Sequence, residues 1–330
     1  MSTPDRELTF AEAIREALAE EMRRDPNVFI LGEDVAEAGT PFKVLSGLVQ
    51  EFGKDRVVDT PISEAGFSGL GVGAAMTGMR PVVDLMFGDF LTLAMDQIVN
   101  QAAKAHYMSG GRWNVPIVFR TTLGATRRSA AQHSQSLHAW VSHIPGIKVA
   151  LPSTPYDAKG LLKTAIRDEN PVVFFEDKMM YKLKGPVPAE DYTIPFGVAD
   201  IKRAGKDITL VATSSMVQVA LGAATLLDQI GISAEVIDPR TTWPLDKQTL
   251  VDSVKKTSRA IVIDEGYERY GVTAEIASVI AGEAFYYLDA PVKRMGAMDV
   301  PIPFSPVLED VTVPTEKTVF EAARALCGKS

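Results

Sequence analysis

Strand-length apolar runs alternate with helical patterns along most of this chain, and this alternation limits its possible folds more than any other feature. Thr9 and Glu12 form a capping-box pattern at the start of the first predicted helix. Thr154, followed by Pro155, is predicted to cap a later helix. The runs predicted as strands in the first half are VFILGED, RVVDT, PVVDLM, VPIVFRTT, IKVALP and PVVFFED. Such alternation is typical of a mostly parallel sheet with helices on both faces, so we expect an α/β fold.

A break rich in proline and glycine divides the chain. Residues 184–197, KGPVPAEDYTIPFG, contain three prolines and two glycines, which is typical of a linker between domains. The alternation restarts after the break with ITLVAT, SAEVID and RAIVID. We therefore predict two domains, at residues 1–185 and 201–330, joined by a linker at residues 186–200.

Composition excludes several classes of protein. The chain has 330 residues, a formal net charge of −8 and 46% hydrophobic residues, an ordinary balance for a soluble globular protein. No segment concentrates Lys and Arg enough to follow a phosphate backbone, so we expect no nucleic-acid partner. No apolar stretch approaches a membrane span, and the N-terminus lacks the apolar core of a signal peptide. The one cysteine, Cys327, cannot form an internal disulfide, and we expect a cytoplasmic protein without membrane attachment.

One carboxylate, Glu64, stands at the head of a predicted helix of small apolar residues, in the stretch DTPISEAGFSGLGVGAA. Ser63 is the predicted N-cap, and Gly66, Gly69 and Gly73 fall on one stripe of the helix, where another backbone or a flat ligand could approach closely. In one interpretation Glu64 only offsets the helix dipole, which is worth about 0.3–1 kcal/mol. In the other, a poorly solvated wall favours its protonated form, and it shares a proton with a ring nitrogen.

Two enzyme classes receive little support from short motifs. Gly69, Gly71 and Ala74 match the dinucleotide fingerprint G-x-G-x-x-A, but no strand immediately precedes the first glycine, so a nicotinamide cofactor is disfavoured. The G-x-S-x-G elbow of many serine hydrolases does not occur in the sequence.

The histidines of the middle of the chain do not form a metal-site pattern. His133, His138 and His143 are spaced by five, which would scatter them around a helix. His133 lies in the polar, turn-prone stretch AAQHSQS. It is either a loop histidine bonded to its neighbours or a proton donor in a cleft.

Longer motifs identify a family. In order along the chain, DTPISEAGFSGLGVGAAMTGMRPVVDLMF, AAQHSQS, PGIKVALPS and AKGLLKTAIRDENPVVFFE closely resemble the beta subunit of the thiamine-diphosphate-dependent first component of 2-oxo acid dehydrogenase complexes. The resemblance extends from the first helix to VTVPTEKTVFEAARAL, essentially the whole chain. It implies an N-terminal pyrimidine-binding domain with a parallel sheet and a transketolase-like C-terminal α/β domain. It also implies an oxidoreductase that acts on an oxo group with a disulfide, the lipoyl group, as acceptor.

The resemblance implies roles for individual residues. The family's active-site glutamate matches Glu64, which would hydrogen-bond N1′ of the aminopyrimidine ring of thiamine diphosphate and promote its imino tautomer, the step that starts decarboxylation. The family's pocket residues beside the pyrimidine match Ile62, Met86 and Phe90. Its active-site histidine, linked to reductive acyl transfer to lipoamide, matches His133.

A potassium site is implied in the same way. Related subunits bind the ion mostly through backbone carbonyls, at positions that match Ile117, Ala165, Ile166, Asp168 and Asn170. Hard oxygen ligands suit an alkali cation, although AIRDEN could equally be an ordinary helix C-terminus.

One missing motif points to a partner. Single-chain thiamine-diphosphate enzymes hold the diphosphate through magnesium with a G-D-G motif and a distant Asn, whereas the nearest string here is GDF at residues 88–90. A diphosphate needs its cation and ligands. The resemblance therefore implies a separate alpha subunit that holds the magnesium, an active site shared in an α2β2 heterotetramer, and docking on a lipoyl acyltransferase core.

The substrate is less constrained than the class. AAQHSQS is closer to the pyruvate and acetoin members than to the branched-chain members, YMSGG leans towards pyruvate, and STPYDAKGLL and YTIPFG lean towards acetoin. Pyruvate is favoured, and acetoin and a branched-chain 2-oxo acid are the alternatives. Arg127 and Arg128 could meet a substrate carboxylate or face solvent, and we expect at least one of them to face solvent. A different hypothesis is a non-catalytic assembly subunit that only completes the fold of an alpha subunit.

Overall fold

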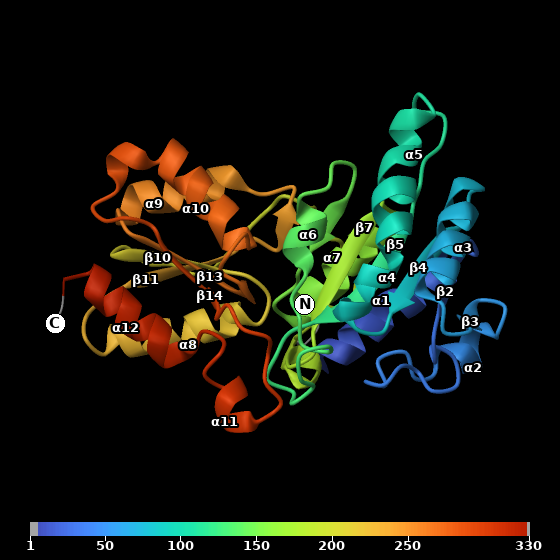
Figure 1. The fold of residues 1–330 in the computed structure, drawn as a ribbon, viewed down its shortest axis with the longest axis horizontal. Helices are drawn as coiled ribbons and strands as arrows, with labels where there is room; N and C mark the ends of the chain where they lie inside the picture. The colour runs from blue at the N-terminus through green and yellow to red at the C-terminus, as the bar shows by residue number, and fades with distance from the viewer. Residues whose placement is uncertain (1–5, 329–330) are drawn as a thin grey trace. The chain divides into compact units, whose positions relative to one another are not determined.

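The computed structural model describes residues 6–328, and the chain folds into two compact units (Figure 1). Unit 1 contains the residues up to Leu123 together with Trp140–Phe196, and unit 2 contains Gly124–Ala139 together with the residues from Gly197 onward. Each unit has its own mostly parallel sheet, which confirms the predicted two-domain α/β fold. Within the described range, none of the helices combines the length and the apolar character needed to cross a bilayer.

A parallel sheet forms the centre of unit 1, with neighbouring strands in the order β6-β7-β5-β4-β2-β3. The strands are β2 (Val28–Gly32), β3 (Val57–Asp59), β4 (Arg80–Leu85), β5 (Val118–Leu123), β6 (Lys148–Ala150) and β7 (Val172–Asp177). Most of their residues are buried, as continuous apolar runs predict for a sheet covered on both faces. A short antiparallel pair, β1 (Glu7–Thr9) and β8 (Lys184–Pro186), lies beside the sheet's helices.

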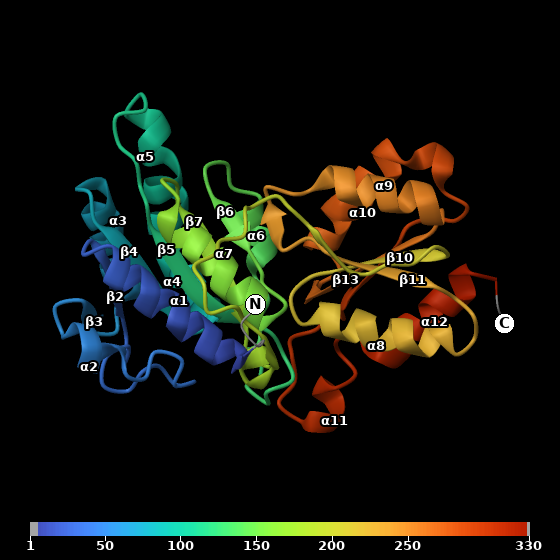
Figure 2. The ribbon, with the colours of Figure 1, turned by 180° about the vertical axis from the view of Figure 1, so that it is seen from behind.

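Helices cover both faces of this sheet (Figure 2). The first face carries α1 (Phe10–Arg24) and α7 (Pro155–Arg167), whose apolar residues share one core cluster. The opposite face carries α3 (Glu64–Met76), α4 (Leu91–Asp96), the π-helical turn η2 (Gln97–Ala102) and α5 (Ala103–Met108). The shorter elements are α2 (Leu48–Phe52), η1 (Gly88–Phe90), α6 (His138–Ser142) and η3 (Met180–Lys182).

The predicted helix starts are present. The hydroxyl of Thr9 accepts a hydrogen bond from the backbone N–H of Glu12, and the Glu12 carboxylate accepts one from the N–H of Thr9, so the capping box closes in both directions. At α7, Thr154 accepts from the N–H of Asp157, and Pro155 occupies the first helical position. Local sequence therefore sets where both helices of the first face begin.

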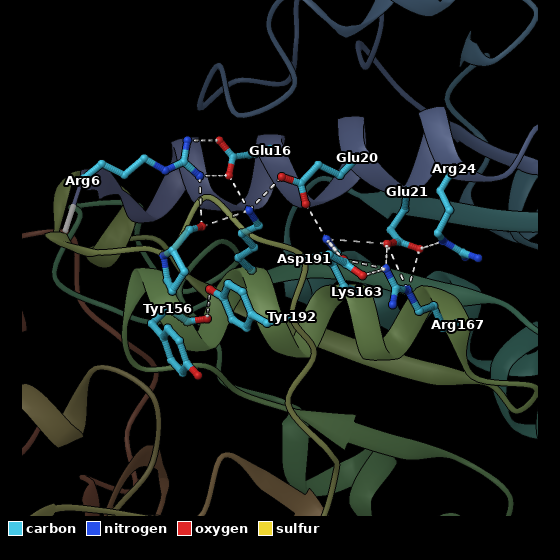
Figure 3. Close-up of polar contacts among 12 residues, drawn as sticks. Arg6, Glu16, Glu20, Glu21, Arg24, Tyr156, Lys163, Arg167, Asp191 and Tyr192 are labelled. Carbon is cyan, nitrogen blue, oxygen red and sulfur yellow. Dashed lines mark hydrogen bonds and ion pairs between the residues drawn. The ribbon is translucent and has the colours of Figure 1, made fainter. Parts of the chain in front are cut away.

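A network of buried ion pairs joins α1 to α7 (Figure 3). Lys159, whose side chain is fully buried, places its Nζ 2.6 Å from a carboxylate oxygen of Glu16 and 2.8 Å from one of Glu20. Lys163, 1% exposed, pairs with Glu20 and Asp191. The network also includes Arg6, Glu21, Arg24 and Arg167. Each buried charge thus has an opposite charge close by, which is the condition for tolerating it in a low dielectric.

We expect the substitution Lys163→Met to lower the free energy of unfolding by about 1.5–3 kcal/mol, because Glu20 and Asp191 lose one charged hydrogen-bond donor but keep Lys159 and Arg167. The midpoint of urea unfolding, followed by circular dichroism, measures this loss. The matched control is Lys54→Ala, which removes a 3.2 Å pair with Glu37 on an exposed surface and should cost about 1 kcal/mol at most. Equal losses in the two variants would contradict the prediction.

Unit 2 has a sheet in the order β14-β13-β10-β11-β9, in which only the edge strand β9 is antiparallel. The strands are β9 (Asp200–Arg203), β10 (Ile208–Ala212), β11 (Ala234–Asp238), β13 (Ala260–Tyr267) and β14 (Lys293–Ala297). One face is covered by α8 (Met216–Asp228) and α12 (Glu316–Leu326), and the other by α9 (Lys247–Thr257) and α10 (Val272–Glu283) (Figure 1). The remaining elements are β12 (Thr241–Trp243), η4 (Phe285–Tyr287) and α11 (Pro306–Glu309).

The segment Gly124–Ala139 belongs to unit 2, although the sequence pattern places it in the N-terminal domain. Its backbone and side chains bond to unit 2: the N–H of Ala125 donates to Glu265, and Arg128 pairs with Glu309 at 2.6 Å. These partners lie far away in the sequence, so neither apolar periodicity nor a linker composition could reveal the contact.

Candidate functional site

The carboxyl edge of the unit 1 sheet collects most of the predicted cofactor residues. Glu64 is the first residue of α3, which follows β3, and Met86 directly follows β4. Glu33 directly follows β2, the strand that lies between β3 and β4. Because parallel strands end at the same edge of a sheet, these three residues lie on one edge, the usual ligand-binding edge of an open α/β sheet.

Glu64 is buried at the head of α3, with only 7% of its surface exposed. Ser63 occupies the predicted N-cap position, but its side chain makes no cap hydrogen bond. The hydroxyl leans over Gly66 instead, since a Cβ at Gly66 would lie 2.7 Å from Ser63 Oγ. The N–H groups of the first turn of α3 are therefore not capped by the Ser63 side chain. The positive end of the helix dipole lies at Glu64, and this end of a helix favours a negative charge.

A second buried acid, Glu33, stands next to Glu64, and the sequence analysis missed it. Glu33 is 8% exposed, and its Oε1 has no hydrogen-bond partner among the described residues. Burial raises the pKa of Glu33, and the negative charge of Glu64 raises it further, with smaller contributions from Asp34 and Asp84. The signal was available, because an acid that directly follows a buried strand, as in VFILGED, must lie at the ligand-binding edge.

The predicted apolar wall lies at the same edge. Ile62, on the turn before α3, is 84% exposed, and Met86 and Phe90 are half-buried. The Phe90 ring meets the Phe87 ring edge-on, with centroids 5.8 Å apart. An exposed aliphatic side chain, a thioether and an aromatic ring near two buried acids suit a flat heterocycle with ring nitrogens. The residues present therefore fit the aminopyrimidine of thiamine diphosphate.

The glycines of α3 serve packing and access, not a nucleotide turn. Gly71 faces the sheet, where a Cβ would lie 2.6 Å from a methyl group of Val83. Gly73 faces open space, and a Cβ at Gly69 would approach Gln97 at 3.3 Å. All three lie inside the helix rather than at a strand-to-helix turn, so the dinucleotide fingerprint lacks its required context.

His133 lies in unit 2, in the loop before α6, and is half-buried. Arg127 in the same segment is exposed, as expected for at least one of the two arginines. Arg128 instead places Nη1 2.6 Å from both Glu309 and Asp310. Its charge is therefore used within unit 2, and this argues against Arg128 as the ligand of a substrate carboxylate.

The predicted potassium ligands lie just before β5, in the last turn of α7 and in the turn between α7 and β7, all in unit 1. Four of them offer backbone carbonyls that accept a hydrogen bond in the structure: Ile117, Ala165, Ile166 and Asp168. A carbonyl oxygen has two lone pairs, so one accepted hydrogen bond does not by itself prevent it from binding a cation. The donor set therefore fits an alkali ion.

Two positively charged side chains, Arg80 and Lys148, already bind the segment that follows α7. Arg80 donates from Nη1 to the carbonyls of Ile166 and Asp168 at 3.0 and 3.1 Å. The Asp168 carboxylate pairs with Lys148 at 2.5 Å and accepts from the side chain of Asn170 at 2.9 Å. Charge repulsion from these two groups should weaken any cation bound here.

Comparison with known proteins identifies both units. A sequence profile described as "Transketolase, pyrimidine binding domain" matches residues 6–184, and one described as "Transketolase, C-terminal domain" matches residues 197–319. The chain is 50% identical to the acetoin:2,6-dichlorophenolindophenol oxidoreductase subunit beta of Bacillus subtilis, over 98% of both chains. It is 51% identical to the pyruvate dehydrogenase E1 component subunit beta of Rhizobium meliloti, over 98% of this chain and 70% of that one. The chain belongs to this family of dehydrogenase beta subunits.

Other relatives lie in the same family. The 2-oxoisovalerate dehydrogenase subunit beta of Bacillus subtilis is 45% identical over 97% of this chain and 98% of its own length. A solved structure titled as a split-gene transketolase in an inactive beta4 tetramer superposes with a TM-score of 0.80 over 97% of this chain and 98% of that chain, at 23% identity. That structure supports the transketolase-like fold of this beta subunit.

We expect Glu33→Gln to stabilise the chain at neutral and alkaline pH. An acid whose pKa is raised in the folded state destabilises the fold above that raised pKa, and the penalty disappears below the pKa of the unfolded chain. The thermal unfolding midpoint of the variant should therefore exceed that of the wild type at pH 8, and the difference should vanish near pH 4. Glu37→Gln, at an exposed acid of the same loop, is the control; an identical response in both variants would refute the assignment.

Proposed function

We propose that this chain is the catalytic beta subunit of a thiamine-diphosphate-dependent first component of a 2-oxo acid dehydrogenase complex, with pyruvate as the favoured substrate. The observation that carries the proposal is the buried carboxylate of Glu64 at the carboxyl edge of the sheet, beside Glu33 and an apolar wall. The names of its relatives support the class of reaction.

Glu64 would act on a proton rather than on the substrate carbon. Bound thiamine diphosphate supplies the nucleophilic carbon and the electron sink that decarboxylation requires. Glu64, whose own surface is 7% exposed, would hold a proton at N1′ of the aminopyrimidine. Glu33 lies at the same edge of the sheet, where its buried carboxyl group adds a second acid beside the ring. Ile62, Met86 and Phe90 would orient the ring.

His133 would serve the second half of the reaction. The 2-oxo acid loses carbon dioxide, and its acyl group passes to one sulfur of a lipoyl disulfide while the other sulfur takes a proton. Histidine is suited to supply that proton near neutral pH. His133 is half-buried in a polar loop, so part of its surface remains exposed.

The partners follow from what this chain lacks. The sequence contains no G-D-G motif for magnesium and diphosphate, so we infer that an alpha subunit holds both in an α2β2 heterotetramer. We infer that a lipoyl acyltransferase core accepts the acyl group. Kinetics with pyruvate, acetoin and 2-oxoisovalerate on the reconstituted heterotetramer would decide the substrate, and acetoin would be the first alternative because of the Bacillus subtilis relative.

We expect Glu64→Gln to lower turnover of the reconstituted heterotetramer by about 10²–10⁴-fold, the usual contribution of general acid–base catalysis, while assembly is unaffected. Steady-state decarboxylation and analytical ultracentrifugation measure the two properties, with Glu37→Gln as the control. Full activity of Glu64→Gln would favour the alternative of a non-catalytic assembly subunit. Calorimetric titration of the chain with NAD should give no heat, and binding would instead favour a nicotinamide enzyme.

We also propose that potassium binds the carbonyls of Ile117, Ala165, Ile166 and Asp168 near Asn170 in unit 1. Replacing choline chloride by KCl at equal ionic strength should then raise the thermal unfolding midpoint, with a gain of about 1.4 kcal/mol at an ion concentration roughly ten times the Kd. NaCl is the control for ion selectivity. Identical midpoints in KCl, NaCl and choline chloride would exclude the site.

A further inference from the structure

The loop that carries His133 is held at both ends by neighbouring carboxylates of a single strand. Near its start, the N–H of Ala125 donates to Oε1 of Glu265. At its end, Nε2 of His138 lies 3.0 Å from Oδ2 of Asp264. Asp264 and Glu265 are consecutive residues of β13, in the interior of unit 2. Both ends of the loop are therefore bound to β13, one at Glu265 and the other at Asp264.

The contact between His138 and Asp264 is buried and hydrogen-bonded, although neither residue takes part in the reaction proposed above. His138 is 1% exposed and Asp264 is 2% exposed. The hydroxyl of Thr213 donates to the other oxygen of Asp264, and the N–H of Gly266 donates to Oδ2 at 2.9 Å. Burial alone would raise the pKa of Asp264, but His138 and these hydrogen bonds hold the pKa below its ordinary value. The carboxylate is therefore an anion that fixes the Nε2 edge of the imidazole.

Gly266 shows that the space around this contact is filled. A Cβ at position 266 would lie 2.6 Å from Oδ2 of Asp264 and 3.3 Å from Cε1 of His138. It would also lie 3.4 Å from the carbonyl oxygen of Ser136, inside the loop itself. A residue other than glycine at this position would displace the Asp264 carboxylate and crowd the His138 ring, so Gly266 is required for the contact as it stands.

The backbone between the two anchors is strained. Thr126, Arg128 and Ala130 have φ angles of 66°, 59° and 57°, a region that costs energy for residues other than glycine and most for a β-branched one. Such conformations persist only where surrounding contacts impose them, and they gather at functional sites. The ion pairs of Arg128 with Glu309 and Asp310 supply one such contact within the strained stretch.

We infer that His138 and Asp264 form a positioning pair for His133: their buried hydrogen bond fixes the distal end of the loop and thereby sets where the His133 imidazole meets the acyl acceptor. This inference rests on the proposed function. It assigns the pair no contact with the substrate or the cofactor. Displacing a reacting group by about 1 Å can cost roughly 10²-fold in rate, so a loop released at one end should lose acyl transfer before it loses decarboxylation.

The test uses the heterotetramer with thiamine diphosphate and magnesium and two readouts. Reduction of dichlorophenolindophenol by the 2-oxo acid reports decarboxylation without a lipoyl group, and acylation of a lipoylated domain of the acyltransferase reports the step assigned to His133. In His138→Gln we expect acylation to fall about 10- to 100-fold, dye reduction to stay within about twofold, and the KM for the 2-oxo acid to be unchanged. His143→Gln, at the exposed histidine after α6, should change neither rate.

Asp264→Asn keeps the shape of the pair and removes only the charge, so it serves if His138→Gln does not fold. The double variant should be no slower than the slower single variant, because two members of one pair lose the same function. Unchanged acylation in both single variants, or a parallel fall of both rates, overturns the inference. A wild-type heterotetramer that reduces no dye with pyruvate, acetoin or 2-oxoisovalerate overturns the proposed function instead, so the two failures are distinguishable.

Discussion

Carboxylates buried at one edge of a parallel sheet are the constraint around which unit 1 is organised. Three neighbouring strands deliver acids to that edge or just before it, at Glu33, Glu64 and Asp84. Asp84 is neutralised inside the protein, because the buried guanidinium of Arg120 donates to it. Glu33 has no such compensation at its Oε1 among the described residues, and burial, together with the charge of Glu64, raises its pKa. The protein therefore pairs one acid of this edge with an arginine and leaves an oxygen of its neighbour without a hydrogen bond.

The network between α1 and α7 shows the opposite treatment of buried charge. There Lys159 and Lys163 each meet more than one carboxylate, and the acids in turn meet more than one cation. Such a fully compensated network holds two helices in register and has little chemistry to offer. Within one domain, therefore, the buried acids that hold helices together are paired with cations, whereas the acids at the proposed site are not paired among the described residues.

Sequence patterns predicted what is encoded locally. The capping pairs at Thr9 and Thr154 and the apolar strands follow from residues within a few positions of one another. Glu64 could be singled out because small residues follow it. Strand β14, KRMGA, escaped prediction because it is a polar edge strand that pairs with β13 only through the tertiary fold.

The site residues that sequence reasoning missed depend on contacts between distant segments. His138 and Asp264 are separated by 126 positions, and nothing near either residue indicates that they meet. Glu33 was within reach, because its place after a buried strand fixes its edge, but its importance appears only beside Glu64. Local rules thus gave the elements and one acid, while the pairing of acids and the anchoring of the His133 loop required the three-dimensional structure.

The path of the chain has a consequence for how such a protein can arise and be divided. The polypeptide passes between the two units at residues 123–124, 139–140 and 196–197, so neither unit corresponds to one continuous stretch of the gene. A fragment beginning at Gly197 would lack the groups of residues 124–139 that bind Asp264, Glu265 and Glu309, namely His138, the N–H of Ala125 and Arg128. Recombination near Gly197 would transfer unit 2 without its residues 124–139. We therefore expect the two halves of the gene to be inherited together.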